Sequence, residues 1–105
     1  MKDTTGGRME LLVLGAVGAG AAHGYAVIDL LRERSSGTFD LAEGTVYPVL
    51  HRLESRGHLQ SRWSDGPGRR RRLYRLTPEG ESALQAHRRD WQVFAAAVNA
   101  TVGSR

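Results

Sequence analysis

The most informative stretch of the chain is GTVYPVLHRLE, which runs from residue 44 to residue 54. Pro48 falls near the start of this run, where its missing N–H costs at most one early helical hydrogen bond. Gly57 follows the run and is the residue type that most readily adopts the left-handed conformation at a helix end. The pattern therefore predicts a helix over residues 43–56. Its apolar residues recur at the spacing of one buried helical face: Val46, Val49, Leu50 and Leu53.

The opposite face of this predicted helix has a different chemical character. It carries Pro48, His51 and Arg52, with Thr45 and Tyr47 on its flanks, and these include hydrogen-bonding, planar and cationic groups. Such groups near the N-terminal end of a helix can contact base edges in the major groove of DNA. Taken alone, however, this face fits an ordinary solvated helix surface better than a DNA contact.

Positive charge is concentrated after this run. The formal net charge is +4, yet residues 51–75 hold eight arginines and two acidic residues. Two strand-like runs, at residues 59–63 and 71–76, flank turn-forming residues 64–68, which predicts a β-hairpin. Four adjacent cations near its tip repel one another, so a bound polyanion is the simplest compensation. If this hairpin is the wing of a winged-helix protein, these cations would contact the phosphates of DNA or enter its minor groove. These cations are Arg69, Arg70, Arg71 and Arg72.

The remaining segments complete a winged helix-turn-helix. Helices are predicted at residues 9–17 and 24–34, the second with Tyr25, Ile28 and Leu31 buried, and a short strand at residues 38–41. Thr77-Pro78-Glu79 marks the start of a last helix that runs to about residue 100, because Thr caps and Pro suits the first helical position. The predicted fold is mainly α with a small β-hairpin. It divides into a DNA-binding domain at residues 8–76 and a C-terminal dimerisation helix at residues 77–102.

Three motifs in this order resemble the PadR family. Residues 44–54 are similar to its recognition-helix signature, residues 23–25 (His-Gly-Tyr) to the start of its second helix, and residues 72–80 to its wing-to-last-helix junction. The resemblance implies a homodimer on an inverted-repeat operator in double-stranded DNA, with the helix at residues 43–56 in the major groove. It places Thr45, Tyr47, Pro48, Arg52 and the wing arginines at the DNA.

The family resemblance also sets the expected function. The protein is expected to be a sequence-specific DNA-binding transcriptional regulator, a repressor released from its operator by a small molecule, and not an enzyme. A winged-helix protein-interaction module and an RNA-binding protein stay open as alternatives. Ala42 departs from the family pattern, which often has Ser there. Because Ala cannot cap a helix, the following helix should lose about 0.5–2 kcal/mol of stabilisation.

The last predicted helix carries an apolar stripe close to heptad spacing. We interpret it first as a dimer seam that packs against the first helix of the partner. The family resemblance adds a second interpretation, a slot for planar aromatic compounds in which Trp91 and then Phe94 would stack. Trp63, on the first strand, is expected in the core or packed against the wing. The residues of the stripe are Leu84, His87, Trp91, Phe94, Ala95 and Val98.

Composition sets further limits. The chain has 105 residues and no cysteine, which excludes disulfides and thiolate metal sites and fits a cytoplasmic protein. The histidines at positions 23, 51, 58 and 87 are scattered, so we expect no metal site and no cofactor. The apolar run at residues 11–22 is too short to span a membrane as a helix.

Overall fold

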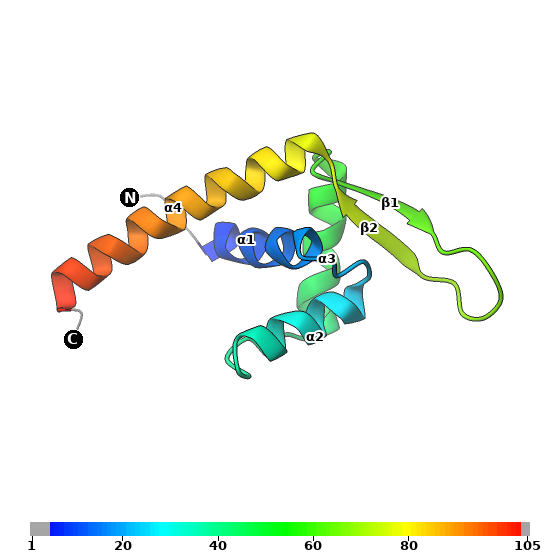
Figure 1. Ribbon diagram of the computed structural model, residues 1–105, viewed down its shortest axis with the longest axis horizontal. Coiled ribbons are helices and arrows are strands. Elements are labelled where there is room, and N and C mark those ends of the chain that lie inside the picture. The colour runs from blue at the N-terminus through cyan, green and yellow to red at the C-terminus, as the bar shows by residue number, and fades with distance from the viewer. Residues whose placement is uncertain (1–4, 104–105) are drawn as a thin grey trace.

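The helices and the hairpin follow the order expected from the sequence. The computed structural model describes residues 5–103 and, for side chains, residues 7–103. That part of the chain begins with three helices, α1 (Thr5–Gly18), α2 (Gly24–Arg34) and α3 (Glu43–Ser55). Two strands follow, β1 (Leu59–Trp63) and β2 (Arg72–Leu76), and the last element is the helix α4 (Pro78–Val102) (Figure 1). The prediction of a mainly helical winged helix-turn-helix with a small antiparallel hairpin is confirmed.

Helix α1 lies at the centre of this arrangement and contacts α2, α3, α4 and β2. Because neighbours surround it, α1 is apolar on more than one side, and Val13, Leu14 and Ala16 are buried. The predicted inner face of α3 is also confirmed, and its packing leaves the opposite face of that helix toward solvent. The four residues of this inner face are at most 4% exposed: Val46, Val49, Leu50 and Leu53.

The junction between the hairpin and α4 is closely packed. Thr77 caps α4 by accepting a hydrogen bond from Gly80 N–H at 2.9 Å, and Pro78 takes the first helical position, as predicted. The Thr77 N–H and hydroxyl donate to the carbonyls of His58 and Gly57. Gly80 lies so close to the His58 carbonyl that a Cβ atom would come within 1.9 Å of its oxygen. The start of α4 is therefore fixed on the turn between α3 and β1.

The hairpin is anchored at its base and free at its tip. Leu59 pairs with Leu76 at the base, and Trp63 pairs with Arg72 toward the tip. Leu59 and Tyr74 are buried and join the helical core, whereas the tip extends beyond the helices (Figure 1). Strand β2 begins at Arg72, one residue later than predicted.

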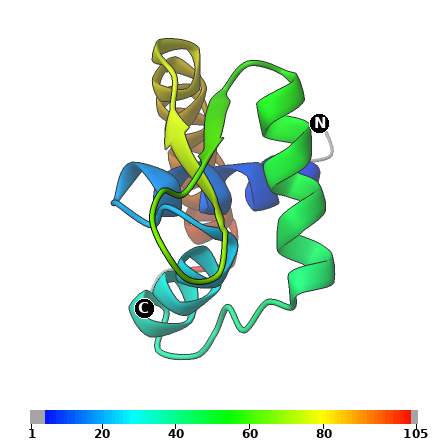
Figure 2. The same cartoon turned by 90° about the vertical axis from the view of Figure 1, so that its right-hand side faces the viewer.

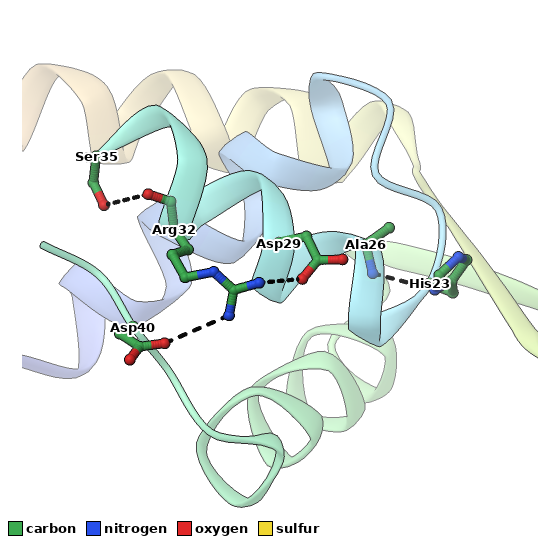
Figure 3. Close-up of polar contacts among 6 residues, drawn as sticks. All are labelled: His23, Ala26, Asp29, Arg32, Ser35 and Asp40. Carbon is green, nitrogen blue, oxygen red and sulfur yellow. Dashed lines mark hydrogen bonds and ion pairs between the residues drawn. The ribbon is translucent and has the colours of Figure 1, made fainter. Parts of the chain in front are cut away.

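One correction concerns residues 38–41, which do not form the predicted strand. Phe39 N–H donates to the Ser35 hydroxyl at 2.8 Å, so a local turn uses a donor that a strand would offer to its neighbour. Arg32 lies 3.6 Å from Asp40 and holds the segment beside the end of α2 (Figure 3). The sheet formed by the described residues is therefore two-stranded.

A second correction concerns Tyr25, which was expected in the core but is 45% exposed. The buried side of α2 is made by Gly24, Val27, Ile28 and Leu31. Val27, on the opposite side of the helix from Tyr25, is fully buried. Tyr25 consequently lies on the outer surface, on the side of α2 that faces α3 and the wing.

Helix α4 gives the molecule its elongated shape. It has 25 residues, which corresponds to about 37 Å at 1.5 Å per residue, and the longest dimension of the chain is 54 Å. Leu84, near its start, is buried in the chain's own core. Beyond that residue α4 runs away from the hairpin, so the C-terminal end lies opposite the wing tip (Figure 1).

Candidate nucleic-acid interface

The outer face of α3 presents the residues expected to contact DNA. Thr45, Pro48, His51 and Arg52 are exposed, and Tyr47 is half-buried. They lie opposite the apolar face that packs on α1 and α2, so the core holds them in one orientation. The helix begins at Ala42, whose side chain makes no capping hydrogen bond, as its residue type predicted.

Tyr47 has a structural role as well as an exposed edge. Its ring lies against Gly24 at the start of α2, where a Cβ atom would come within 2.4 Å of Tyr47 Cζ. It also makes an edge-on contact with Tyr25 at 6.4 Å between ring centroids, and a tilted contact with His51 at 6.5 Å. The absence of a side chain at Gly24 therefore lets the Tyr47 ring pack directly against the start of α2.

Tyr25 lies on this candidate interface, and the sequence pattern did not place it there. Its hydroxyl donates to Glu43 Oε1 at 2.9 Å, and this hydrogen bond raises the pKa of Tyr25 above its ordinary value of 10.0. The bond joins the start of α2 to the start of α3. The sequence signal for this role was the glycine before the tyrosine, because Gly24 is the buried member of the pair.

Two wing arginines are ordered by an aromatic side chain. The guanidinium groups of Arg70 and Arg72 lie 4.7 Å and 5.0 Å from the centre of the Trp63 ring. Trp63 is 48% exposed, so the expectation that it packs against the wing is confirmed and the core position is excluded. Arg72 also lies 3.7 Å from Glu54 at the end of α3, and the Ser61 hydroxyl donates to the same carboxylate. These contacts connect the wing to α3.

The wing also contacts the start of α2. Arg71 Nη1 lies 3.0 Å from His23 Nε2, and His23 caps α2 by accepting the Ala26 N–H through Nδ1 at 3.2 Å (Figure 3). Burial, and then the positive charge of Arg71, lower the pKa of His23 below its ordinary value of 6.5. The structure therefore favours a neutral imidazole at this position.

A cavity of about 150 Å³ opens where the wing, α2 and α3 meet, and we call it the wing cavity. The hairpin lies beside α3 when the wing faces the viewer (Figure 2). All four arginines of the predicted run reach this cavity, so the structure brings them together with Tyr47 from α3. A cationic cavity with aromatic walls suits an oxyanion such as a phosphate. It is lined by His23, Gly24, Tyr25, Tyr47, Arg69, Arg70, Arg71 and Arg72.

The predicted stripe on α4 is buried near the start of the helix and exposed farther along it. Leu84 is buried within the chain, which leaves its side chain little surface for a partner, whereas Val98 is 39% exposed. Trp91 and Phe94 lie with ring centroids 5.9 Å apart, and Arg8 of α1 lies 4.8 Å from the centre of the Phe94 ring. A second cavity, of about 240 Å³, lies between α1 and α4 of the same chain. It is lined by Gly7, Arg8, Leu11, His87, Asp90, Trp91 and Phe94.

A metal site and a membrane-spanning helix are two further possibilities for the part of the chain that the structure describes. Within it, no group of three or more His, Cys, Asp or Glu side chains is placed to hold a metal ion. No helix among those residues is long and apolar enough to cross a membrane.

Comparison with protein families gives one match that covers most of the chain. The profile described as the Transcriptional regulator PadR-like family matches residues 13–86, a span that includes α3 and the whole hairpin. A transcriptional regulator of Mycobacterium tuberculosis is 47% identical to this chain over 60 residues. That alignment covers 57% of this chain and 56% of the mycobacterial protein, so it spans little more than half of that relative.

Solved structures share the same arrangement. A PadR family transcription regulator from Clostridium difficile is 31% identical, with a TM-score of 0.78 over 90% of this chain and 98% of that chain. Bacillus subtilis PadR in complex with operator DNA is 23% identical, with a TM-score of 0.67 over 82% of this chain and 47% of that one. The similarity to the Bacillus subtilis structure establishes a common winged-helix fold.

Proposed function

This chain belongs to the PadR-like family of transcriptional regulators, and from that premise we propose that it is a sequence-specific DNA-binding repressor that acts as a homodimer. The observation that carries the proposal is that the four wing arginines and Tyr47 of α3 line one cavity. Bacillus subtilis PadR was solved in complex with operator DNA, which supports duplex DNA as the partner here.

In this proposal α3 enters the major groove. Thr45, His51 and Arg52 face base edges, and Arg52 has the planar donor pair that binds guanine O6 and N7. Pro48 has no N–H to donate and offers an apolar contact to a thymine methyl group. Tyr47, held in place by Gly24, positions its neighbours more than it reads sequence.

The wing arginines supply affinity rather than sequence choice. Arginines near a flexible tip neutralise phosphates, and phosphate contacts set the position of a protein on DNA without reading bases. Arg70 and Arg72 are held by Trp63, so less side-chain freedom is lost when they meet the backbone. Residues 8–76 form the DNA-binding unit in this proposal.

Helix α4, within residues 77–102, provides the dimer contact. Several large apolar side chains of its distal part are exposed in the single chain, and their burial against a second copy would stabilise a dimer by about 25 cal/mol per Å². A twofold dimer presents two α3 helices related by symmetry, which matches an inverted repeat. The exposed residues that share one side of α4 are Trp91 at 44%, Val98 at 39% and Val102 at 73%.

The cavity between α1 and α4 is our proposed effector site. A planar aromatic compound would stack on Trp91 and Phe94, in the place where the Arg8 guanidinium now lies. Such a ligand releases DNA only if it favours a dimer in which the two α3 helices are wrongly spaced. Flat dyes, flavins and phenolic acids should quench tryptophan fluorescence. Trp91→Ala should abolish that quenching, Trp63→Phe should retain it, and quenching that survives Trp91→Ala would contradict the site.

The proposed function is tested by selection of DNA. Purified protein is mixed with fragments of the genome that encodes it, and the retained fragments are sequenced and footprinted. We expect an inverted repeat protected on two half-sites, and a reporter gene behind that repeat should be repressed by the protein in the cytoplasm. Retention of RNA in place of duplex DNA, or no enrichment of any sequence, would contradict the proposal and favour the RNA-binding or protein-interaction alternatives.

A further inference from the structure

His23 lies between two hydrogen-bond donors. Its Nδ1 atom is 3.2 Å from the Ala26 backbone nitrogen and accepts the N–H that begins α2 (Figure 3). Its Nε2 atom is 3.0 Å from Arg71 Nη1 on the wing. Both neighbours carry hydrogen toward the imidazole, because a backbone N–H and a guanidinium are donors without an acceptor.

A neutral imidazole cannot satisfy both neighbours. It has one acceptor nitrogen, and the other nitrogen carries a hydrogen. If Nδ1 accepts from Ala26, the Nε2–H group faces the N–H of Arg71. If Nε2 accepts from Arg71, the Nδ1–H group faces Ala26 and the helix cap is lost. Either tautomer leaves two donors opposite each other with no acceptor between them.

The surroundings of this contact contain the space and the charge for an acceptor. His23 and Arg71 line the wing cavity together with three more arginines and two tyrosines. The cavity volume of about 150 Å³ is about ten times the roughly 15 Å³ of cavity space that one water molecule needs. A tetrahedral oxyanion fits this volume, and its oxygens are acceptors only.

We propose that the wing cavity binds one phosphate group, and that His23 Nε2–H and Arg71 Nη1–H are its paired donors. The source to which we commit is a phosphodiester of the DNA backbone, so this inference rests on the proposed function. With the phosphate in place, the tautomer that caps α2 is also the one that donates to DNA. The wing and the start of α2 then both contact the same phosphate of the DNA backbone.

Several charged and titratable groups face this histidine. On α2, Asp29 raises the pKa of His23. The wing contributes Arg71, which lowers that pKa, and three further arginines of the same cavity, while α3 contributes Tyr47. Burial lowers the pKa and is the largest influence, so His23 is a neutral donor in the free protein. A bound phosphate must raise the pKa of His23, because an anion stabilises the imidazolium form.

Nitrogen-15 NMR of the histidine side chains gives a direct readout. In the free dimer, His23 should show a protonated Nε2 and an unprotonated Nδ1. Saturation with the selected operator duplex should raise the pKa of His23, and inorganic phosphate should do the same at millimolar concentration. A duplex that binds and leaves the Nε2 resonance and the pKa unchanged would overturn the phosphate site while the proposed function stands.

The two ligands separate the remaining outcomes. If the duplex does not bind but inorganic phosphate raises the pKa of His23, the cavity takes a free phosphorylated compound, and both the DNA source and the proposed function are wrong. If the duplex does not bind and inorganic phosphate leaves the resonance unchanged, the inference and the proposed function both fail.

A matched pair of variants tests the same contact by affinity. His23→Ser keeps a strong N-cap residue but has no second polar atom to offer. We expect its Kd for the operator to rise about a hundredfold, because each of the two half-sites loses one charge-assisted hydrogen bond worth about a factor of ten, with the thermal midpoint unchanged. Arg88→Ala removes one cation from the exposed side of α4, away from the wing cavity, and should change Kd less than twofold.

Duplexes with single methylphosphonate linkages then locate the phosphate. One position in each half-site should weaken binding of the wild-type protein more than binding of His23→Ser, because the variant has already lost one of the two donors to that phosphate. If every methylphosphonate weakens both proteins by the same factor, His23 makes no contact with a single phosphate and the inference is wrong.

Discussion

Gly80 is the position where one added methyl group should disturb the fold most. A Cβ atom there would lie 1.9 Å from the His58 carbonyl oxygen, whereas ordinary contacts begin at 3.4 Å, so the start of α4 has to move by about 1.5 Å. The obstacle is backbone and cannot rotate away. The shift would pull Thr77 from the carbonyls of Gly57 and His58 and loosen the cap of α4.

The expected loss follows from these contacts. Overpacking of this kind costs about 1–3 kcal/mol, and a weakened N-cap adds about 1 kcal/mol. We therefore expect Gly80→Ala to lower the free energy of unfolding by about 2–4 kcal/mol, measured by urea denaturation at equal protein concentration. Gly44→Ala is the control, since nothing lies within 4 Å of its Cβ position, and it should gain up to about 1 kcal/mol. Equal stability of Gly80→Ala and wild type would refute the reasoning.

Three further predictions follow from the interface. Replacing Arg69 and Arg70 by Ala should weaken binding to all duplexes alike and flatten the plot of log K against log salt by about 0.9 per lost contact; a changed sequence preference with an unchanged slope would count against the wing assignment. Because the folded protein holds the pKa of His23 below 6.5, the unfolded chain takes up that proton first, so the free energy of unfolding should fall as the pH drops below about 6.5 and then level off. Acid titration monitored by circular dichroism should show this fall, and His23→Ser should lack it. Ala42→Ser should raise the free energy of unfolding by about 0.5–2 kcal/mol, measured by urea denaturation, because Ala42 makes no side-chain capping bond. No gain would mean that the backbone N–H groups at the start of α3 already have hydrogen-bond partners.

Much of the fold was predictable because its signals are local. The spacing of Val46, Val49, Leu50 and Leu53 determines which side of α3 is buried, and that choice also determines which side is left for DNA. Thr77 was identifiable as a cap from residue type alone, because its hydrogen bond closes within three residues. Periodicity and capping need no knowledge of what lies far along the chain.

The unpredicted features depend on contacts between distant segments. Tyr25 fits the apolar period of α2, yet it is exposed because Gly24 takes the buried place at this turn, beside the ring of Tyr47. His23 has no side-chain pattern that marks a cap next to a wing arginine 48 positions away. Trp63 reads as a core aromatic until the hairpin register places it opposite Arg72.

Leu84 shows a related limit of sequence patterns. It continues the heptad-like stripe of α4, but only the structure shows that the stripe passes from the chain's own core to an exposed surface. Leu84 is 6% exposed and Trp91, seven residues later, is 44% exposed. Periodicity identifies an apolar face and does not say which neighbour covers it.

The most direct measurement of the central claim is the affinity of the protein for its selected operator as a function of salt, together with the stoichiometry of the complex. If α3 and the wing form one DNA interface in a dimer, two chains should bind each duplex, and Kd should rise steeply between 50 and 200 mM salt, with a slope of about 0.9 per phosphate contacted. Arg52→Ala should lose preference for the operator over unrelated duplexes. Binding that is insensitive to salt, or no binding to duplex DNA, would contradict the account.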